Sequence, residues 1–243
     1  MQGPTLGHHI SRRFDEDLER VRARVLEMGG LVEAQLGAAV NALIASDHEL
    51  GARAARQDHT INAMEVAIDE ECQRLLAIRS PTASDLRLVV AIIKTITDLE
   101  RIGDEGQKVA YIASRMVASE TTSDHYRQVK HLARLALHSV HEALDSFARL
   151  DADAALGLSR DDRILDQEYE AVQRQGITLM LEDPRAIRRV LDVLWVARAL
   201  ERIGDHAKNI GEYVIYMVYG KDIRHTKLEE IERALQELSL IHI

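Results

Sequence analysis

Two pairs of carboxylates, each spaced four residues apart, are the side chains of this sequence best suited to chemistry. Glu100 and Asp104 form one pair, and Glu201 and Asp205 form the other. Residues at positions i and i+4 are neighbours on a helix surface, so the members of each pair share a patch and repel each other. The spacing leaves three interpretations open: a hydrated face, carboxylates balanced by arginine, or a cation site.

Two further polar pairs have the same four-residue spacing. They are Asp58 with Asn62, and Asp162 with Asp166. If neighbouring helices direct these pairs and the first two into common clefts, the ligands are oxygens only. Such ligands suit magnesium, manganese, calcium or iron rather than a thiolate-preferring metal.

The positions of these pairs repeat along the chain. The segment Glu-Arg-Ile-Gly-Asp occurs at 100–104 and again at 201–205, 101 residues later. The Asp58 and Asp162 segments form a second, weaker echo. A repeat of about 100 residues is too long for a solenoid unit and indicates a duplicated domain.

Helical periodicity over most of the chain predicts the elements that position the carboxylates. Ser80-Pro81 and Asp183-Pro184 interrupt it, because proline disfavours a helical residue before it, and Ser46, Ser123 and Asp151 are typical N-caps. The predicted helices are 12–45, 48–78, 82–118, 124–149, 153–181 and 184–219. We therefore predict an all-α fold of two pseudo-symmetric three-helix bundles, 12–120 and 124–220, with a charged C-terminal tail at 221–243.

Composition excludes several classes of protein. The chain has 243 residues and a formal net charge of −9, which argues against the cationic footprint of a nucleic-acid binder. Hydrophobic residues make up 46%, enough for a packed core. The single cysteine, Cys72, excludes a disulfide framework and favours a reducing compartment. Because no secretory signal or long apolar run is visible, we expect a cytoplasmic protein.

Several segments, taken in order, resemble the PhoU family, the bacterial accessory proteins of the phosphate-specific transport system. They lie at 64–71, 80–87, 98–104, 147–151, 162–169 and 201–205, and the resemblance extends over residues 12–225. The resemblance implies an all-α fold of two pseudo-symmetric three-helix bundles, in agreement with the periodicity.

The resemblance also implies a metal-binding role. Some family members hold multinuclear metal clusters through Glu/Asp-x-x-x-Asp, which maps here onto Glu100 with Asp104 and Glu201 with Asp205. The positions on the preceding helices map onto Asp58, Asn62, Asp162 and Asp166. Asn62 departs from the pattern because an amide is neutral and a weaker ligand. The implied cofactors are divalent or iron-type metal ions.

For function, the resemblance implies a negative regulator of the phosphate-starvation response without catalytic activity. Its implied partners are the ATPase subunit of the phosphate ABC transporter and a sensor histidine kinase, with the membrane reached only through partners. The sequence contains no Gly-x-x-x-x-Gly-Lys, Gly-x-Ser-x-Gly or His-Glu-x-x-His segment. The alternative is a metal-dependent hydrolase or oxidase using the paired carboxylates, although none of the 11 histidines follows a glutamate by three residues.

Asp85 and Arg87, at the start of the third predicted helix, are candidate partner-binding residues. Pro184-Arg-Ala-Ile-Arg188 replaces them in the second half, so they could select one partner. A helix cap with a solvated arginine explains them equally well. We also expect a homodimer.

Six other side chains carry simpler expectations. Cys72 is expected to be a small buried hydrophobe, and His206 a surface residue. Trp195 is expected to anchor either the core or a dimer contact. The tyrosines at 213, 216 and 219 recur every three residues and predict a packed stripe.

Overall fold

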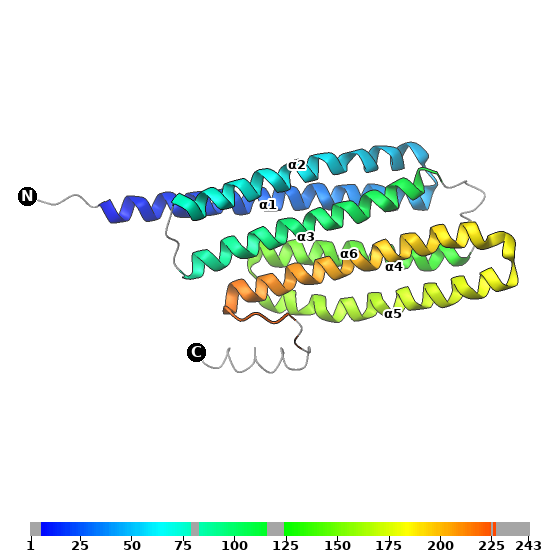
Figure 1. The fold of residues 1–243 in the computed structure, drawn as a ribbon. Coiled ribbons are helices and arrows are strands. Elements are labelled where there is room, and N and C mark those ends of the chain that lie inside the picture. Colours follow the sequence, from blue (N-terminus) through cyan, green and yellow to red (C-terminus); the bar gives the residue numbers. More distant parts are fainter. Residues whose placement is uncertain (1–5, 79–82, 116–123, 225, 227–243) are drawn as a thin grey trace, which may run out of the picture.

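Six long α-helices make up most of the protein in a computed structural model, which describes residues 6–78, 83–115, 124–224 and 226 (Figure 1). No strand occurs in these ranges. The helices are α1 Leu6–Ala45, α2 His48–Ile78, α3 Ala83–Ala113, α4 Asp124–Arg149, α5 Ala152–Glu182 and α6 Ile187–Tyr219, with a 3-10 turn, η2 Pro184–Ala186, before α6.

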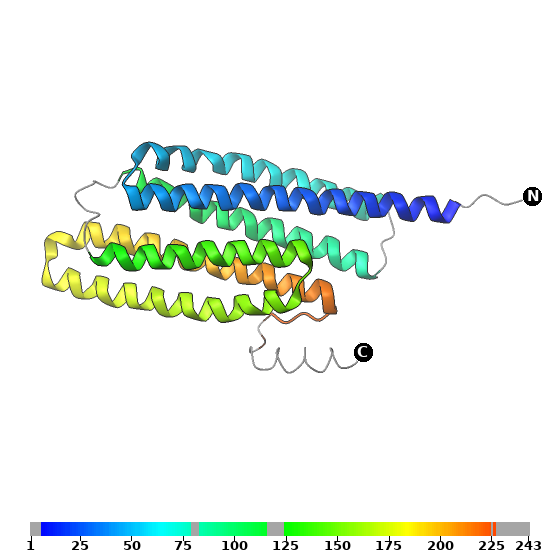
Figure 2. The ribbon, with the colours of Figure 1, turned by 180° about the vertical axis from the view of Figure 1, so that it is seen from behind.

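The helices form two bundles of three that lie side by side. Helices α1, α2 and α3 pack against one another, and so do α4, α5 and α6. Helix α3 lies along α6 and joins the bundles, with a smaller contact between α1 and α4 (Figures 1 and 2). The predicted all-α fold of two three-helix bundles is confirmed. The domain limits stay predictions, since 116–123 and nearly all of the tail after 224 lie outside the described residues.

Equivalent turns end the first helix of each bundle. Ser46 and Leu150, with φ of 55° and 52°, occupy the left-handed region directly before an aspartate. Asp151 caps α5 as predicted, accepting a hydrogen bond from the Ala154 amide at 3.0 Å. The cap of α2 is Asp47, which accepts from the Leu50 amide at 2.9 Å. The predicted cap Ser46 is therefore wrong by one residue, because it forms the turn itself.

Each bundle has a very close contact between two helices, formed by a glycine on one helix and an alanine on the other. The helix that carries the glycine differs between the two bundles. A Cβ on Gly51 of α2 would lie 2.9 Å from the carbonyl oxygen of Ala110 in α3. In the second bundle, a Cβ on Gly211 of α6 would lie 3.0 Å from the carbonyl oxygen of Ala155 in α5. The same glycine–alanine contact thus holds each helix pair together, with the glycine on opposite partners. This reciprocity supports an origin by duplication.

Helix α1 contains a long apolar stretch. Its segment Phe14–Ala45 is the one described stretch long and apolar enough, by length and composition, to cross a membrane. Half of its most apolar window is buried within the protein, as in a core helix, so the composition is weak evidence for a membrane span. Val21, Val25, Met28 and Val32 are fully buried there. The apolar side chains of α1 therefore form part of the core.

Candidate functional site

The glycine of each Glu-Arg-Ile-Gly-Asp segment lets a neighbouring helix approach. A Cβ on Gly103 would lie 3.3 Å from Ile61 Cδ1 of α2, and a Cβ on Gly204 would lie 2.9 Å from Leu165 Cδ1 of α5. The interface of α2 with α3 and that of α5 with α6 are therefore equivalent, and we call them the two grooves. The structure brings together all eight residues predicted as metal ligands, as a first cluster and a second cluster. The first cluster is Asp58, Asn62, Glu100 and Asp104; the second cluster is Asp162, Asp166, Glu201 and Asp205.

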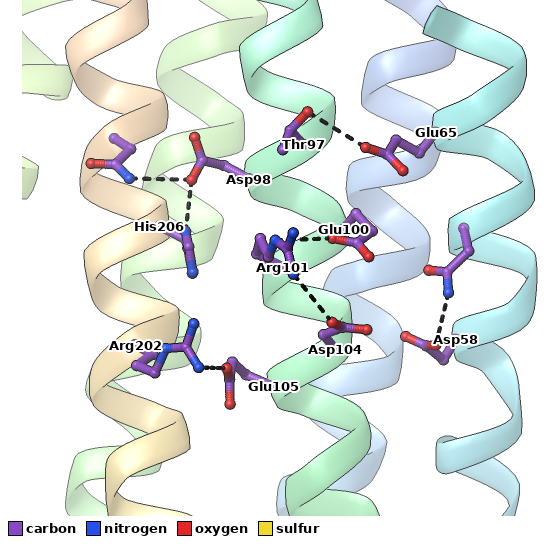
Figure 3. Close-up of polar contacts among 12 residues, drawn as sticks. Asp58, Glu65, Thr97, Asp98, Glu100, Arg101, Asp104, Glu105, Arg202 and His206 are labelled. Atoms are coloured by element: carbon purple, nitrogen blue, oxygen red, sulfur yellow. Dashed lines mark hydrogen bonds and ion pairs between the residues drawn. The ribbon is translucent and has the colours of Figure 1, made fainter.

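In the first cluster, carboxylates face one another with little compensating charge (Figure 3). Asp58 is 5% exposed, and burial together with the charge of Asp104 raises its pKa. Burial and the charge of Asp104 likewise raise the pKa of Glu100. Asn62 Nδ2 donates to Asp58 Oδ2 at 3.1 Å. Among the described residues, only the half-exposed Arg101 brings a lysine or arginine nitrogen within 4.0 Å of these carboxylates, at 3.5 and 3.8 Å.

The second cluster contains its own cations. Lys208 Nζ lies 2.7 Å from Oδ2 of the buried Asp162. Although burial opposes its charge, the hydrogen bond to Asp162 raises the pKa of Lys208. Arg198 Nη1 donates to Glu201 Oε1 at 2.7 Å. Burial and the charge of Asp205 still raise the pKa of Glu201, so the two cations do not fully balance the cluster.

Four buried oxygens in the clusters fit a hard cation. Asp58 Oδ1, Asn62 Oδ1, Asp162 Oδ1 and Glu201 Oε2 are buried without a hydrogen-bond partner. Burying such an atom costs free energy unless a hydrogen-bond donor or a cation compensates it. Within the described residues, however, no three His, Cys, Asp or Glu side chains are arranged to hold a metal ion. The donor atoms therefore suit a metal by type and burial, whereas their arrangement does not form a coordination sphere.

Helix α3 carries a second acidic face, turned toward α6, that the sequence analysis missed. Asp98 accepts from Asn209 Nδ2 at 3.2 Å and lies 2.7 Å from His206 Nδ1 (Figure 3). Glu105 lies 2.5 Å from Arg202 and 2.9 Å from Lys108. Asp98 and Glu105 are seven residues apart, which places both on one helix face. This spacing was the signal in the sequence for the second acidic face.

The contact with Asp98 corrects the expectation for His206. Its side chain is only 17% exposed, because it lies in the contact between the bundles rather than on the surface. Trp195 is 64% exposed, so it does not anchor the core, and the alternative of a dimer contact stays a prediction. Cys72 is fully buried as predicted, and burial raises the pKa of its thiol to about 12.

The predicted partner-binding residues lie at the other end of α3. Asp85 is in the first turn of α3, where its charge is favourable. Arg87 is half-buried and lies against Gly220, the left-handed residue that ends α6. The Arg87 guanidinium therefore packs on the end of α6. A role of these two residues in binding a partner stays a prediction.

Comparison with known proteins gives matches over nearly the whole chain. A family model described as "PhoU domain" matches residues 25–113 and 129–214. A phosphate-specific transport system accessory protein PhoU homolog from Pseudomonas aeruginosa is 50% identical over 232 residues, covering 96% of each chain. The accessory protein PhoU of Escherichia coli is 44% identical over 238 residues, covering 97% of each chain.

Solved structures agree with these sequence matches. The crystal structure of PhoU from Pseudomonas aeruginosa has a TM-score of 0.83 at 51% identity, covering 86% of this chain and 100% of that chain. The structure of the phosphate transport system regulatory protein PhoU from Streptococcus pneumoniae has a TM-score of 0.80 at 30% identity, covering 86% of this chain and 98% of that one. The similarity therefore includes both bundles and both clusters.

Proposed function

The chain belongs to the PhoU family, and from this premise we propose that it is an accessory protein of a phosphate-specific transport system. We propose further that it is a non-catalytic adaptor that represses the phosphate-starvation response and modulates phosphate uptake when phosphate is plentiful. Its partners in this proposal are the ATPase subunit of the phosphate ABC transporter and a sensor histidine kinase.

One observation carries the proposal: proteins named as accessory to phosphate transport match this chain end to end, at 44% to 50% identity. Such similarity over nearly the whole chain supports the same role for this protein. The proposal also places the protein in the cytoplasm, at the membrane only through its partners and away from nucleic acid, consistent with the net charge of −9. The homodimer stays a prediction.

The two bundles provide a physical basis for an adaptor. A duplicated fold offers two related surfaces, and here their charges differ. The α2–α3 groove continues into an acidic pocket of about 430 Å³ that includes Glu65, Asp69 and Glu70. At the equivalent positions, α5 has Tyr169, Gln173 and Arg174. Two grooves with equal geometry and different charge can bind two different partners, because electrostatic complementarity selects between them.

A gene deletion tests the proposal directly. Deleting the gene should leave alkaline phosphatase induced in phosphate-rich medium, and the wild-type gene supplied in trans should restore repression. Co-purification from cells grown in high phosphate should then recover the transporter ATPase and the kinase. Normal repression in the deletion strain would reject the regulatory role.

We also propose that a hard divalent or iron-type cation binds to the clusters. Support comes from the raised pKa values of Asp58, Glu100, Glu201 and Asp205 and from the buried oxygens without partners. A bound cation would supply positive charge that relieves repulsion and fixes the surface of each groove for a partner. Elemental analysis of the purified protein tests this, and Asp205→Ala should lower metal content with little change in helix content.

A further inference from the structure

A pocket of about 820 Å³ lies between the two bundles, and one of its lining residues, Arg198, also contacts Glu201 of the second cluster. Its walls come from the C-terminal half of α3 and the N-terminal half of α6, and Ala55 of α2 closes one side. The volume falls within the roughly 300–1,000 Å³ typical of small-molecule sites. Nothing in the proposed adaptor role uses this pocket.

The pocket combines an apolar floor with exposed aromatic rings. Ile112 and Ala199 form the floor, at 6% and 3% exposure. Trp195 on α6 and Tyr111 on α3 are 64% and 59% exposed. Large aromatic rings left in water at the edge of a pocket cost free energy unless a ligand covers them. A flat ring is the natural ligand for such walls.

Four cationic side chains surround the same space. Arg115 lies over the Tyr111 ring at 5.1 Å and donates to Asp192 through Nη2 at 2.8 Å. Arg198 donates through Nη1 to Glu201. The other two cations, Arg202 and Lys108, both contact Glu105. A guanidinium has five N–H donors, so each arginine keeps donors for an incoming anion.

At the equivalent positions on the opposite side of the α3–α6 contact, a cation and two rings contact each other. There, Lys94 lies over the Tyr213 and Tyr216 rings at 5.4 and 5.9 Å. Lys94 is the repeat equivalent of Trp195, and Tyr216 is the equivalent of Arg115, each 101 residues apart. The ring and the cation have thus exchanged equivalent positions, and on both sides the ring comes from α6 and the cation from the α3 segment. The Tyr213 and Tyr216 rings lie against Lys94, whereas the Trp195 ring stays 64% exposed.

We propose that this pocket binds a nucleotide, with the base against Trp195 and Tyr111 and the phosphates on Arg115, Arg198 and Arg202. A planar ring linked to several anionic oxygens matches both features of the pocket at once. Inorganic phosphate would use only the arginines and leave the rings exposed. An acidic peptide without aromatic residues would also lack the planar ring.

The protein supplies its own reporter, because Trp195 is its single tryptophan. The full-length protein is titrated with ATP in EDTA, so that divalent ions bound at the carboxylate clusters do not contribute. ATP should quench the Trp195 fluorescence saturably, with matching heat in calorimetry. Adenosine and tripolyphosphate, which each carry half of the ligand, should bind at least roughly tenfold more weakly.

Substitutions inside and outside the pocket show where ATP binds. Arg115→Gln, at a half-exposed side chain, should weaken ATP binding roughly fivefold or more, because a charge-assisted contact is lost. Trp195→Leu should do the same in calorimetry. Arg101→Gln is the matched control, since Arg101 is the repeat equivalent of Arg202 and lies outside the pocket; it should bind ATP like wild type.

Four results would overturn the proposal. They are no quenching and no heat with ATP up to about 10 mM, equal affinity for tripolyphosphate and ATP, wild-type affinity in both Arg115→Gln and Trp195→Leu, or tighter binding of a hexaglutamate peptide than of ATP. The last result would assign the pocket to an acidic protein segment.

Discussion

The two carboxylate clusters occupy equivalent grooves, but the negative charge in each is balanced differently. The second cluster has four carboxylates and two cations, Lys208 and Arg198, while the first has three carboxylates and an amide. Gln107 and Thr97 stand where the second half has Lys208 and Arg198. The first half thus has the amide of Asn62 where the second half has the carboxylate of Asp166, and neutral residues where the second half has the two cations. Because the two clusters occupy equivalent positions but differ in charge balance, matched substitutions can test each one separately.

Removing Lys208 should have the largest effect on the second cluster. Lys208→Met leaves the buried Asp162 without its cation and should lower the free energy of unfolding by about 2 kcal/mol, less than for a fully buried pair because Lys208 is about a third exposed. Urea unfolding measures this. Gln107→Met at the equivalent position should cost less than about 1 kcal/mol, since only a hydrogen bond to the Ala55 carbonyl is lost. Equal losses would show that the cation is not what distinguishes the halves.

The two clusters should also differ in how much each contributes to the affinity for metal ions. Because no ammonium sits in the first cluster, Asp58→Asn should lower the affinity for Mn²⁺ roughly tenfold, whereas Asp162→Asn should have a smaller effect. Calorimetry on metal-free protein gives both values. In Lys208→Met the second cluster should gain affinity for Mn²⁺, and unchanged affinity in that variant would contradict competition between ammonium and metal.

The pH dependence of stability should differ as well. The raised pKa of Glu100 means that its ionisation destabilises the folded protein, so this cost is absent below the ordinary value of 4.5 and grows as pH rises through the folded pKa. Glu100→Gln should therefore stabilise the protein by roughly 0.5–1 kcal/mol at pH 7 without metal, and by nothing near pH 4. Glu201→Gln should gain less, because it also loses the charged contact with Arg198. Unfolding at both pH values checks the sign.

A further expected difference, of similar size, concerns the glycines under the two grooves. A Cβ at position 204 would approach Leu165 to 2.9 Å, closer than the 3.3 Å between position 103 and Ile61. Alanine favours a helix by up to about 1 kcal/mol over glycine, and overpacking opposes this. Gly103→Ala should be nearly neutral and Gly204→Ala less stable than it by roughly 1 kcal/mol. Thermal unfolding of both variants measures the difference.

Several features of the fold followed from local pattern. Apolar residues of α6 such as Val193, Ala197 and Leu200 recur at three- and four-residue spacing, and the structure buries them. The helix ends at Asp151 and before Pro184 were predicted for the same reason, since caps and prolines act within a few residues. The start of α1 was placed at 12 rather than Leu6, because the ends of helices leave weak signals.

The carboxylate faces were also visible in the sequence, but the groups opposite them were not. The pairing of Lys208 with Asp162 spans 46 residues, and that of His206 with Asp98 spans 108. Neither follows from spacing along one helix. The sequence likewise left the exposure of Trp195 open, because a single aromatic residue in a helical pattern can be a core residue or a surface contact until its neighbours are known.

The sequence by itself determined the helices, their duplication and the acidic face of each repeat, because these depend on a period of about 3.6 residues and on identity between two segments. Only the tertiary structure decided which cation balances which carboxylate, that His206 is half-buried between the bundles, and that α3 and α6 form a pocket beside Trp195. Those outcomes depend on the register in which helices pack, and that register is set by side chains far apart in the chain.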